Sequence, residues 1–328
     1  MKEVLNYLFT QQPLDREGAK TVLLELASGR HNAAQTAAVL TVYLMRPVTV
    51  EELQGFREGM LELCTKAIFD VPVMDVCGTG GDGKNTFNIS TLAAFVVAAA
   101  GQPVAKHGNY GVSSVCGSSN ILEHFGFRFT SNTDELKRQL ERANICFLHA
   151  PLFHPAMKNV APVRKDLGIK TFFNMLGPLV NPAFPPIQFT GVFSLELARL
   201  YGYLLQQTSG RFMVVHSLDG YDEISLTGSF RYYATYGEGL MVPDDLGLTE
   251  VSPGEIAAGP SVEDSAAIFL NVLQGKGTDA QTQVVIANAA LALHCARPDV
   301  PVRQCADAAR EALLSGKAFQ CFKKLLEN

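Results

Sequence analysis

A glycine-rich stretch in the first third of the chain has the composition of a phosphate-binding loop. Residues 75–91 read DVCGTGGDGKNTFNIST and lie between an apolar run typical of a strand and a run typical of a helix. Glycines let backbone N–H groups approach an anion closely, and the start of the following helix adds unpaired N–H groups and a favourable dipole. A plain glycine turn is the alternative, but four glycines with polar neighbours at this junction favour phosphate.

Two well-known nucleotide motifs fit this loop incompletely. Gly78, Gly80 and Gly83 match the dinucleotide fingerprint, but the segment VAKH at 104–107 stands where an acidic residue is expected about 20 positions later. The P-loop pattern also begins correctly, but Asn85 occupies the position where Ser or Thr would bind magnesium. Both standard nucleotide-binding predictions are therefore weakened.

A second loop rich in small polar residues follows the next expected strand. Residues 106–120 read KHGNYGVSSVCGSSN and lead into a helix. Lys106 supplies a point charge and four serines supply hydroxyls near a helix start, so this loop is suited to a second phosphate group. These serines are Ser113, Ser114, Ser118 and Ser119. A turn or capping role is the alternative for each single serine, but two such loops predict a ligand with separated phosphates.

Two adjacent carboxylates, Asp222 and Glu223, closely follow an apolar run at 212–216. Carboxylates at the carboxyl end of a strand suit Mg²⁺, which takes a few carboxylates together with water and substrate phosphates. A solvated acidic turn is the alternative. The two phosphate loops make the metal site the favoured interpretation.

The elements that must position these segments fall into two parts. Residues 1–70 show helical periodicity and predict four short helices, with capping-box spacing at Thr49 and Glu52. From residue 71, short apolar strands alternate with helical stretches, which is typical of a mainly parallel sheet. Strands are expected at 71–76, 104–106, 146–148, 189–193 and 212–216, and helices at 91–100, 134–143, 195–207, 282–294 and 303–326.

We therefore predict an α/β fold in which a small N-terminal α-helical domain, residues 1–70, joins a larger α/β domain, residues 71–328, with a mainly parallel central sheet. The helical domain is the expected dimer interface, and part of residues 155–185 is a candidate for packing against it. The α/β domain is expected to bind the phosphate-bearing ligand.

Composition excludes several classes of protein. The 328 residues are 47% hydrophobic, with 27 basic and 32 acidic side chains and a net charge of −5. No apolar run approaches the roughly 20 residues that cross a bilayer, and the first residues do not resemble a signal peptide, so we expect a cytoplasmic protein without membrane partners. The negative charge makes nucleic acid an unlikely main partner. Seven scattered cysteines without a C-x-x-C pair predict free, mostly buried thiols.

Taken together, these motifs resemble the anthranilate phosphoribosyltransferase family of tryptophan biosynthesis. The resemblance rests on GTGGD at 78–82, NIST at 88–91, KHGN at 106–109 and DE at 222–223. It continues through HPAM at 154–157, PVRK at 162–165, FNMLGPLVNP at 173–182 and ANAA at 287–290, and so covers most of the chain. Members of that family combine a helical and an α/β domain and are commonly homodimers through the helical part.

The resemblance implies transfer of the phosphoribosyl group of 5-phosphoribosyl 1-pyrophosphate (PRPP) to the amino group of anthranilate, with release of pyrophosphate. It implies Mg²⁺ as cofactor, two ions per site, and metal contacts from Ser90, Asp222 and Glu223. The implied donor-binding residues are Gly78, Gly81, Asp82, Thr86, Asn88, Ser90, Thr91, Lys106, His107, Gly108, Asn109, Ser113, Ser114 and Ser118. The implied anthranilate-binding residues are Gly78, Asn109, His154, Arg164 and Gly177.

Arg164 is the expected partner of the anthranilate carboxylate, because a guanidinium matches a carboxylate with two parallel hydrogen bonds. No general base is assigned, since an aromatic amine is already a neutral nucleophile. The chain departs from the family pattern at Tyr110, where Arg is common, and at Asn120, where Asp is common. The change at Tyr110 removes a positive charge from the donor loop, although we expect activity to be retained.

Two alternatives stay open at this point. A pyrimidine nucleoside phosphorylase-like enzyme shares the architecture and the glycine loop, but it does not need paired acids for a metal. A non-enzymatic, nucleic-acid-binding relative should have a basic surface and lack those acids.

Overall fold

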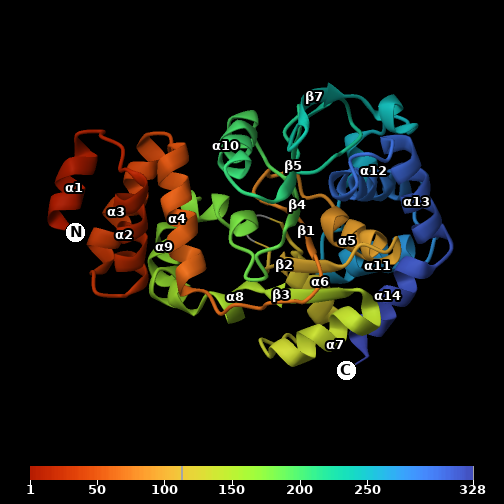
Figure 1. Cartoon of the computed structure of the whole chain (residues 1–328), viewed down its shortest axis with the longest axis horizontal. Helices are drawn as coiled ribbons and strands as arrows, with labels where there is room; N and C mark the ends of the chain where they lie inside the picture. The colour runs from red at the N-terminus through yellow and green to blue at the C-terminus, as the bar shows by residue number, and fades with distance from the viewer. Residues whose placement is uncertain (112–113, 328) are drawn as a thin grey trace.

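The computed structural model of the chain describes residues 1–111 and 114–327. Four helices form a bundle at one end of the molecule (Figure 1): α1 (Lys2–Phe9), α2 (Arg16–Ala27), α3 (Ala33–Met45) and α4 (Val50–Leu63). Side-chain oxygens of Asp15, Asn32 and Thr49 cap the starts of α2, α3 and α4. The predicted capping box is present, because Glu52 also accepts the backbone N–H of Thr49.

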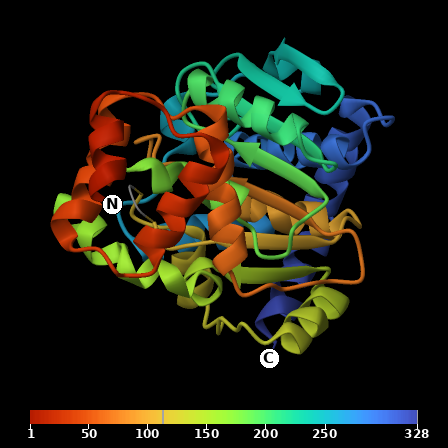
Figure 2. The same ribbon diagram turned by 60° about the vertical axis from the view of Figure 1, so that its left-hand side comes forward.

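A seven-stranded sheet with the order β3-β2-β1-β4-β5-β6-β7 forms the centre of the larger part (Figure 2). Its strands are β1 (Met74–Gly78), β2 (Val104–Gly108), β3 (Ile145–His149), β4 (Ile187–Gly191), β5 (Arg211–Ser217), β6 (Phe230–Ala234) and β7 (Gly237–Met241). The first five are parallel, whereas β6 and β7 add an antiparallel hairpin at one edge. The chain starts at β1, builds outward to β3, and returns to the other side of β1 with β4.

Helices cover both faces of this sheet. One face packs against α5 (Ile89–Ala99) and α12 (Asp279–Ala296), and the other packs against α10 (Leu195–Gln206). Along β5, Met213 and Val215 belong to the hydrophobic core that contains α5 and α12, and Phe212 and Val214 belong to the core that contains α10. This alternation buries both faces, as is usual for a parallel sheet.

The other helices surround this framework. They are α6 (Ser118–His124), α7 (Thr133–Ala143), α8 (Ala150–Phe153), α9 (Ala161–Leu167), α11 (Val262–Leu273), α13 (Val302–Leu314) and α14 (Lys317–Leu326). Short 3₁₀ turns include η1 (Pro155–Asn159), η2 (Phe172–Met175) and η3 (Gly177–Leu179), and two further ones are η4 (Pro243–Leu246) and η5 (Pro253–Ile256). Among the described residues, none of the helices has the length and apolar character needed to span a bilayer.

The helical bundle shares a hydrophobic core with the segment before β4. Helix α3 contacts α9 and η2, and α4 contacts α10. Phe56 of α4 stacks on Phe172 of η2 with ring centroids 4.3 Å apart, and both rings are almost fully buried. The segment 160–180 is therefore held between the bundle and the sheet, where it can form one wall of a site.

The predicted fold class is confirmed: a small N-terminal helical part precedes a larger α/β part with a mostly parallel sheet. The seven cysteines are free, and five of them are buried. The single helix expected at 303–326 is instead the pair α13 and α14, which a left-handed Gly316 (φ +79°) separates. Strands β6 and β7 were not expected from the sequence, because their residues alternate less clearly between apolar and polar.

Candidate active site

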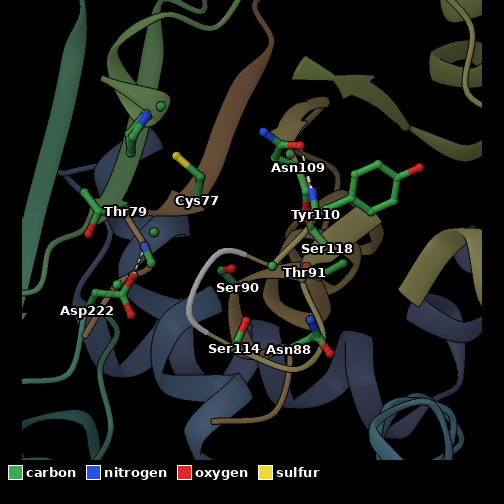
Figure 3. Close-up of a pocket in the computed structure, with 18 of the residues that line it drawn as sticks. Cys77, Thr79, Asn88, Ser90, Thr91, Asn109, Tyr110, Ser114, Ser118 and Asp222 are labelled. Atoms are coloured by element: carbon green, nitrogen blue, oxygen red, sulfur yellow. Dashed lines mark hydrogen bonds between the residues drawn. The ribbon is translucent and has the colours of Figure 1, made fainter. Parts of the chain in front are cut away.

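A pocket of about 280 Å³ opens at the carboxyl ends of β1, β2 and the loop after β5. Strand β1 lies between β2 and β4, and the chain leaves it in both directions along the sheet. Ligands of open parallel sheets bind at such a switch point. Figure 3 shows side chains of the first loop, the second loop and Asp222 around a common space.

The pocket gathers most of the residues that the sequence predicts for the site. Those that line it are Gly78, Gly81, Asp82, Thr86, Asn88, Ser90, Thr91, Lys106, His107, Gly108, Asn109, Ser114, Ser118, Arg164, Gly177, Asp222 and Glu223. Ser113 lies outside the described residues. His154 is the one predicted site residue of the described part that does not line the pocket.

Side chains replace the hydrogen bonds between β1 and β2 next to the pocket. Strand β1 pairs with β4 along its whole length, but with β2 only at Met74 and Val104. Beyond that pair, Asp75 Oδ1 accepts the backbone N–H of His107 at 3.1 Å. Lys106 Nζ donates to the Val76 carbonyl oxygen at 2.6 Å. The backbone ladder between the two strands therefore ends at Met74 and Val104, and side chains take over its role toward the pocket.

Asp75 and Lys106 are both buried. Burial raises the pKa of Asp75 and lowers the pKa of Lys106, while the opposite charge of each partner acts against its shift. The amide of Asn181 donates to the Ala105 carbonyl oxygen at 2.9 Å, and so satisfies another backbone group of β2. Where the backbone ladder between β1 and β2 ends, side chains thus form the hydrogen bonds that backbone groups of a neighbouring strand would otherwise form.

The acidic pair after β5 is held against the glycine loop. Asp222 Oδ2 accepts the backbone N–H of Gly80 at 2.5 Å, and Glu223 Oε1 accepts the backbone N–H of Ser90 at 2.9 Å, at the start of α5. A Cβ atom at Gly78 would lie 2.6 Å from Asp222 Oδ2, and one at Gly191 would lie 1.7 Å from the Asp222 carbonyl oxygen. Only glycine allows this close approach at both positions.

Three acidic side chains crowd together here. Burial and the charge of Asp82 raise the pKa of Asp222 to about 7, and burial and the charge of Asp222 raise the pKa of Glu223. Asp82 Oδ2, Asn88 Oδ1 and Glu223 Oε2 are buried without a hydrogen-bond partner in the described part of the chain. Unpaired buried oxygens are uncommon in proteins and mark a place where a ligand or ion belongs.

The second loop is closed by the side chain of Asn120. Its Oδ1 accepts the backbone N–H groups of Gly111 at 3.0 Å and Gly117 at 2.9 Å. Asn88 of the first loop donates to the Cys116 carbonyl oxygen at 2.9 Å, which joins the two loops. The departure from Asp to Asn therefore keeps an oxygen acceptor at position 120.

Tyr110 does not supply the positive charge that Arg would supply at this position. Its hydroxyl donates to Glu123 Oε1 at 3.2 Å, and its ring packs edge-on against His149 at 5.0 Å. It also lines the pocket mouth. Tyr110 thus anchors the start of the second loop through α6, without adding a positive charge.

Arg164 approaches the pocket from the segment that packs on the helical bundle. Its Nη2 donates to Asn174 Oδ1 at 3.3 Å, and its guanidinium carbon lies 5.2 Å from the centroid of the Phe173 ring. Among the described residues no carboxylate pairs with it, and burial lowers its pKa. Arg164 therefore offers hydrogen-bond donors to an anionic ligand beside an aromatic face.

The two histidines of the predicted site are neutral and structurally engaged. His107 Nδ1 donates to the Gly177 carbonyl oxygen at 3.1 Å, and burial lowers the pKa of His107 to about 3. His154 Nε2 donates to the Val180 carbonyl oxygen at 2.9 Å, and burial lowers its pKa to about 4. His154 is buried and does not line the pocket, and its Nδ1 has no hydrogen-bond partner among the described residues, so its contact with anthranilate stays a prediction.

Sequence reasoning missed Asp75, Asn181 and Gly191 as residues that build the site. Asp75 was visible as a carboxylate inside a buried strand, which is a costly placement and a signal of a specific partner. The close approach of Gly191 to Asp222 gives no signal in a single sequence, because the two residues meet only in three dimensions.

The fold and the site define a class of protein. The glycosyl transferase family has a helical bundle domain whose model matches residues 2–64, and an α/β domain whose model matches residues 70–319. These two matches cover the bundle and the sheet described above, including both loops and the acidic pair.

Individual relatives narrow this class. The chain is 53% identical to the anthranilate phosphoribosyltransferase of Cytophaga hutchinsonii over 328 residues, which is 100% of both chains. The solved anthranilate phosphoribosyltransferase of Thermus thermophilus gives a TM-score of 0.91 at 33% identity and covers 98% of each chain. The structure of the Saccharomyces cerevisiae enzyme in complex with PRPP and Mg gives 0.91 at 26% identity, covering 98% of this chain and 96% of that one. The chain belongs to the anthranilate phosphoribosyltransferase family.

The burial of His154 predicts a measurable pH effect on stability. Its folded pKa of about 4 lies below the ordinary value of 6.5, so the unfolded chain binds this proton first as the pH falls. The resulting stability is complete above pH 6.5 and is lost toward pH 4. Between pH 5.5 and 4.5, the free energy of unfolding of the native chain should fall relative to that of His154→Gln by about 1.2 kcal/mol.

Urea unfolding at several pH values measures this difference. His124→Gln, changed at an exposed histidine of α6, is the matched control and should follow the native chain. Parallel pH curves for the native chain and His154→Gln would show that His154 is not held neutral.

Proposed function

We propose that the chain transfers the phosphoribosyl group of PRPP to the amino group of anthranilate, giving N-(5-phosphoribosyl)anthranilate and pyrophosphate in tryptophan biosynthesis. The observation that carries this proposal is the single pocket that joins two loops of phosphate-binding character, an acidic pair and an unpaired arginine beside an aromatic ring. Relatives that match the full length of the chain have this activity in their name.

The donor occupies the part of the pocket between the two loops. Residues of the first loop and of the start of α5 line this space, and the second loop adds hydroxyls. The residues assigned to the donor are Gly78, Gly81, Asp82, Thr86, Asn88, Ser90, Thr91, Lys106, His107, Gly108, Asn109, Ser114 and Ser118. Ser113, which lies outside the described residues, stays a prediction.

Lys106 attracts the phosphate groups of the donor from a fixed position. Its ammonium group is buried and donates to the Val76 carbonyl oxygen, so the charge sits at the base of the pocket. It contributes there an attractive field for phosphate oxygens, strengthened by the low local dielectric.

The acidic residues at the pocket fit a divalent cation. Asp82 and Glu223 have buried oxygens without a partner in the described chain, and burial and the charge of Asp82 raise the pKa of Asp222, so a cation at this place would stabilise the ionised forms. No cluster of three His, Cys, Asp or Glu side chains in the described part forms a cation cage by itself. Mg²⁺ agrees with this, because it commonly uses one or two carboxylates together with water and substrate phosphates.

Asp222, Glu223 and Ser90 are the residues assigned to Mg²⁺, with two ions per site. When bound, Mg²⁺ neutralises the charge that develops on pyrophosphate as it leaves. The hydrogen bonds from the Gly80 and Ser90 N–H groups fix the orientation of both carboxylates before any ligand arrives.

Anthranilate lies on the opposite side, toward the segment 164–178. Arg164 holds its carboxylate, while Gly78, Asn109 and Gly177 line the space for its ring and amine. His154, the fifth residue assigned to anthranilate, is buried next to His107, which lines the pocket, and its role stays a prediction. Phe173 also lines the pocket and presents an apolar surface to the ring. Positioning the amine next to the ribose carbon is the main catalytic effect, since it replaces a bimolecular encounter.

The chemical step needs no side-chain base. The amine nitrogen forms a bond to ribose C1 while the bond from C1 to the pyrophosphate oxygen breaks, and the surplus amine proton then passes to water. His107 donates its Nδ1 proton to the Gly177 carbonyl oxygen, and its pKa of about 3 makes it a weak base. It orients the turn at Gly177 and stays neutral.

The homodimer and the cytoplasmic location stay predictions. Exposed apolar side chains on the bundle support a dimer contact, since Phe9 of α1 is 61% exposed and Met45 of α3 is 81% exposed.

A fluorescence assay tests the proposed reaction. Anthranilate emission should decay only when PRPP and Mg²⁺ are both present, because glycosylation of the amine changes the fluorophore. A flat trace from folded protein would reject the proposal. Phosphorolysis of a pyrimidine nucleoside by the same preparation would favour the phosphorylase alternative.

Arg164→Ala should raise the KM for anthranilate by about ten- to hundred-fold, because charge-assisted hydrogen bonds to the carboxylate are lost. The KM for PRPP should change much less. Arg142→Ala, at an exposed arginine of α7, is the matched control. An equal rise in both KM values for Arg164→Ala would contradict the carboxylate role.

The pair of changes Asp222→Asn and Glu223→Gln should increase the Mg²⁺ concentration needed for half-maximal activity by about ten-fold or more, and lower turnover. The amides keep the size of the acids and remove their charge. A magnesium titration of steady-state rates measures the shift, with Asp219→Asn as the control at an exposed acid. An unchanged titration would remove both residues from the metal site.

A further inference from the structure

A second cavity lies at the amino ends of the sheet strands, whereas the active-site pocket lies at their carboxyl ends. It has a volume of about 250 Å³ and lies between α4 of the bundle and the amino ends of β4 and β5. Its polar lining includes Arg57, Arg211, Asn181 and Gln188, and its apolar lining includes Phe184 and Phe212. This volume is slightly below the roughly 300–1,000 Å³ of pockets for drug-sized ligands, so a small metabolite is the fitting occupant.

The cavity carries positive charge without a counter-ion in the described chain. Arg57 donates its Nε–H to the Leu179 carbonyl oxygen at 3.1 Å, and Arg211 donates one Nη1–H to the Ala296 carbonyl oxygen at 2.6 Å. No described carboxylate forms an ion pair with either arginine, and none of the described lining residues is Asp or Glu. The nearby Glu58 pairs with Arg16 instead.

The surroundings reinforce this charge. Lys66 Nζ lies 5.5 Å from the centroid of the Phe184 ring, which places a third cation beside the lining. Arg57 is partly buried and burial lowers its pKa, whereas Arg211 is exposed. Because neither guanidinium has an ion-pair partner in the described chain, an anion that accepts from their Nη groups is favourable.

The same polar groups hold one wall of the active-site pocket. Pro178 lines both the pocket and the cavity. Arg57 binds the Leu179 carbonyl oxygen and Gln188 binds the Pro178 carbonyl oxygen, while Asn181 binds Ala105 of β2. A ligand that contacts these groups therefore also acts on the turn η3, which borders the active site.

We propose that this cavity binds a small monocarboxylate with a compact apolar body. Its carboxylate pairs with Arg57 and Arg211, and its apolar part packs against Phe184 and Phe212. The Nε–H of Arg57 stays on the Leu179 carbonyl oxygen while its Nη groups hold the ligand, so occupancy fixes η3. This proposal stands on the cavity and does not depend on the reaction proposed above.

Benzoate and its neutral analogue benzamide test the site by calorimetric titration of the full chain. The Arg164→Gln background removes the other arginine that offers donors to a carboxylate, in the active-site pocket. We expect this variant to bind about one benzoate per chain, and to bind benzamide about ten-fold more weakly or not at all, because the charge-assisted hydrogen bonds are absent.

Adding Arg57→Gln to this background should weaken benzoate binding by about ten-fold or more. Arg211→Gln, at a more exposed position, should also weaken it, and it decides the question if Arg57→Gln does not fold. Arg142→Gln is the matched control and should leave binding unchanged. The proposal is overturned if the Arg164→Gln background does not bind benzoate, if benzamide binds equally well, or if neither arginine variant weakens binding.

Discussion

The interrupted backbone ladder between β1 and β2 is the constraint on which the site depends. Two neighbouring parallel strands normally stay bonded along their length, but here the buried carboxylate of Asp75 takes the N–H of His107, and Lys106 reaches back to the Val76 carbonyl oxygen. Backbone groups released by the missing ladder are thereby satisfied, as buried polar groups must be. The loops that follow the two strands both line the pocket. Burying two charged side chains adds little net stability, so the value of Asp75 and Lys106 here is geometric.

The pocket has an acidic side and a basic side, and these charges indicate which substrate binds at each. Acidic oxygens from Asp82, Asp222 and Glu223 gather at one side and lack a cation, whereas Arg164 at the other side lacks a carboxylate. The missing cation matches a metal-bound diphosphate, and the missing carboxylate matches an aromatic acid. The segment that carries Arg164 packs on the helical bundle, and Lys170 from the same segment donates to the Gly81 carbonyl oxygen. Bundle and sheet thus meet at the place where the two substrates must meet.

Much of this could be predicted from the sequence, because glycine-rich loops and apolar runs act locally. The strand-to-helix junction at 75–91, the second loop at 106–120 and the capping box at Thr49 depend on residues that are close in the chain. The parts that could not be predicted depend on contacts across the fold. The hydrogen bond between His154 and the Val180 carbonyl oxygen joins residues 26 positions apart, and a single sequence gives no signal for it. The need for Gly191 appears only when Asp222, from the loop after β5, lies against it.

Donor binding by variants of Asp75 is the most direct test of the claim that side chains replacing the ladder between β1 and β2 position the site. Calorimetric titration with PRPP in the presence of Mg²⁺ should show affinity reduced by about ten-fold or more in Asp75→Ala, because the partner of His107 N–H and the charge opposite Lys106 are both lost. Asp75→Asn keeps an acceptor for that N–H and should recover part of the affinity. Equal binding by the native chain and a folded Asp75→Ala would contradict the positioning role, as would an Asp75→Asn variant no better than Asp75→Ala.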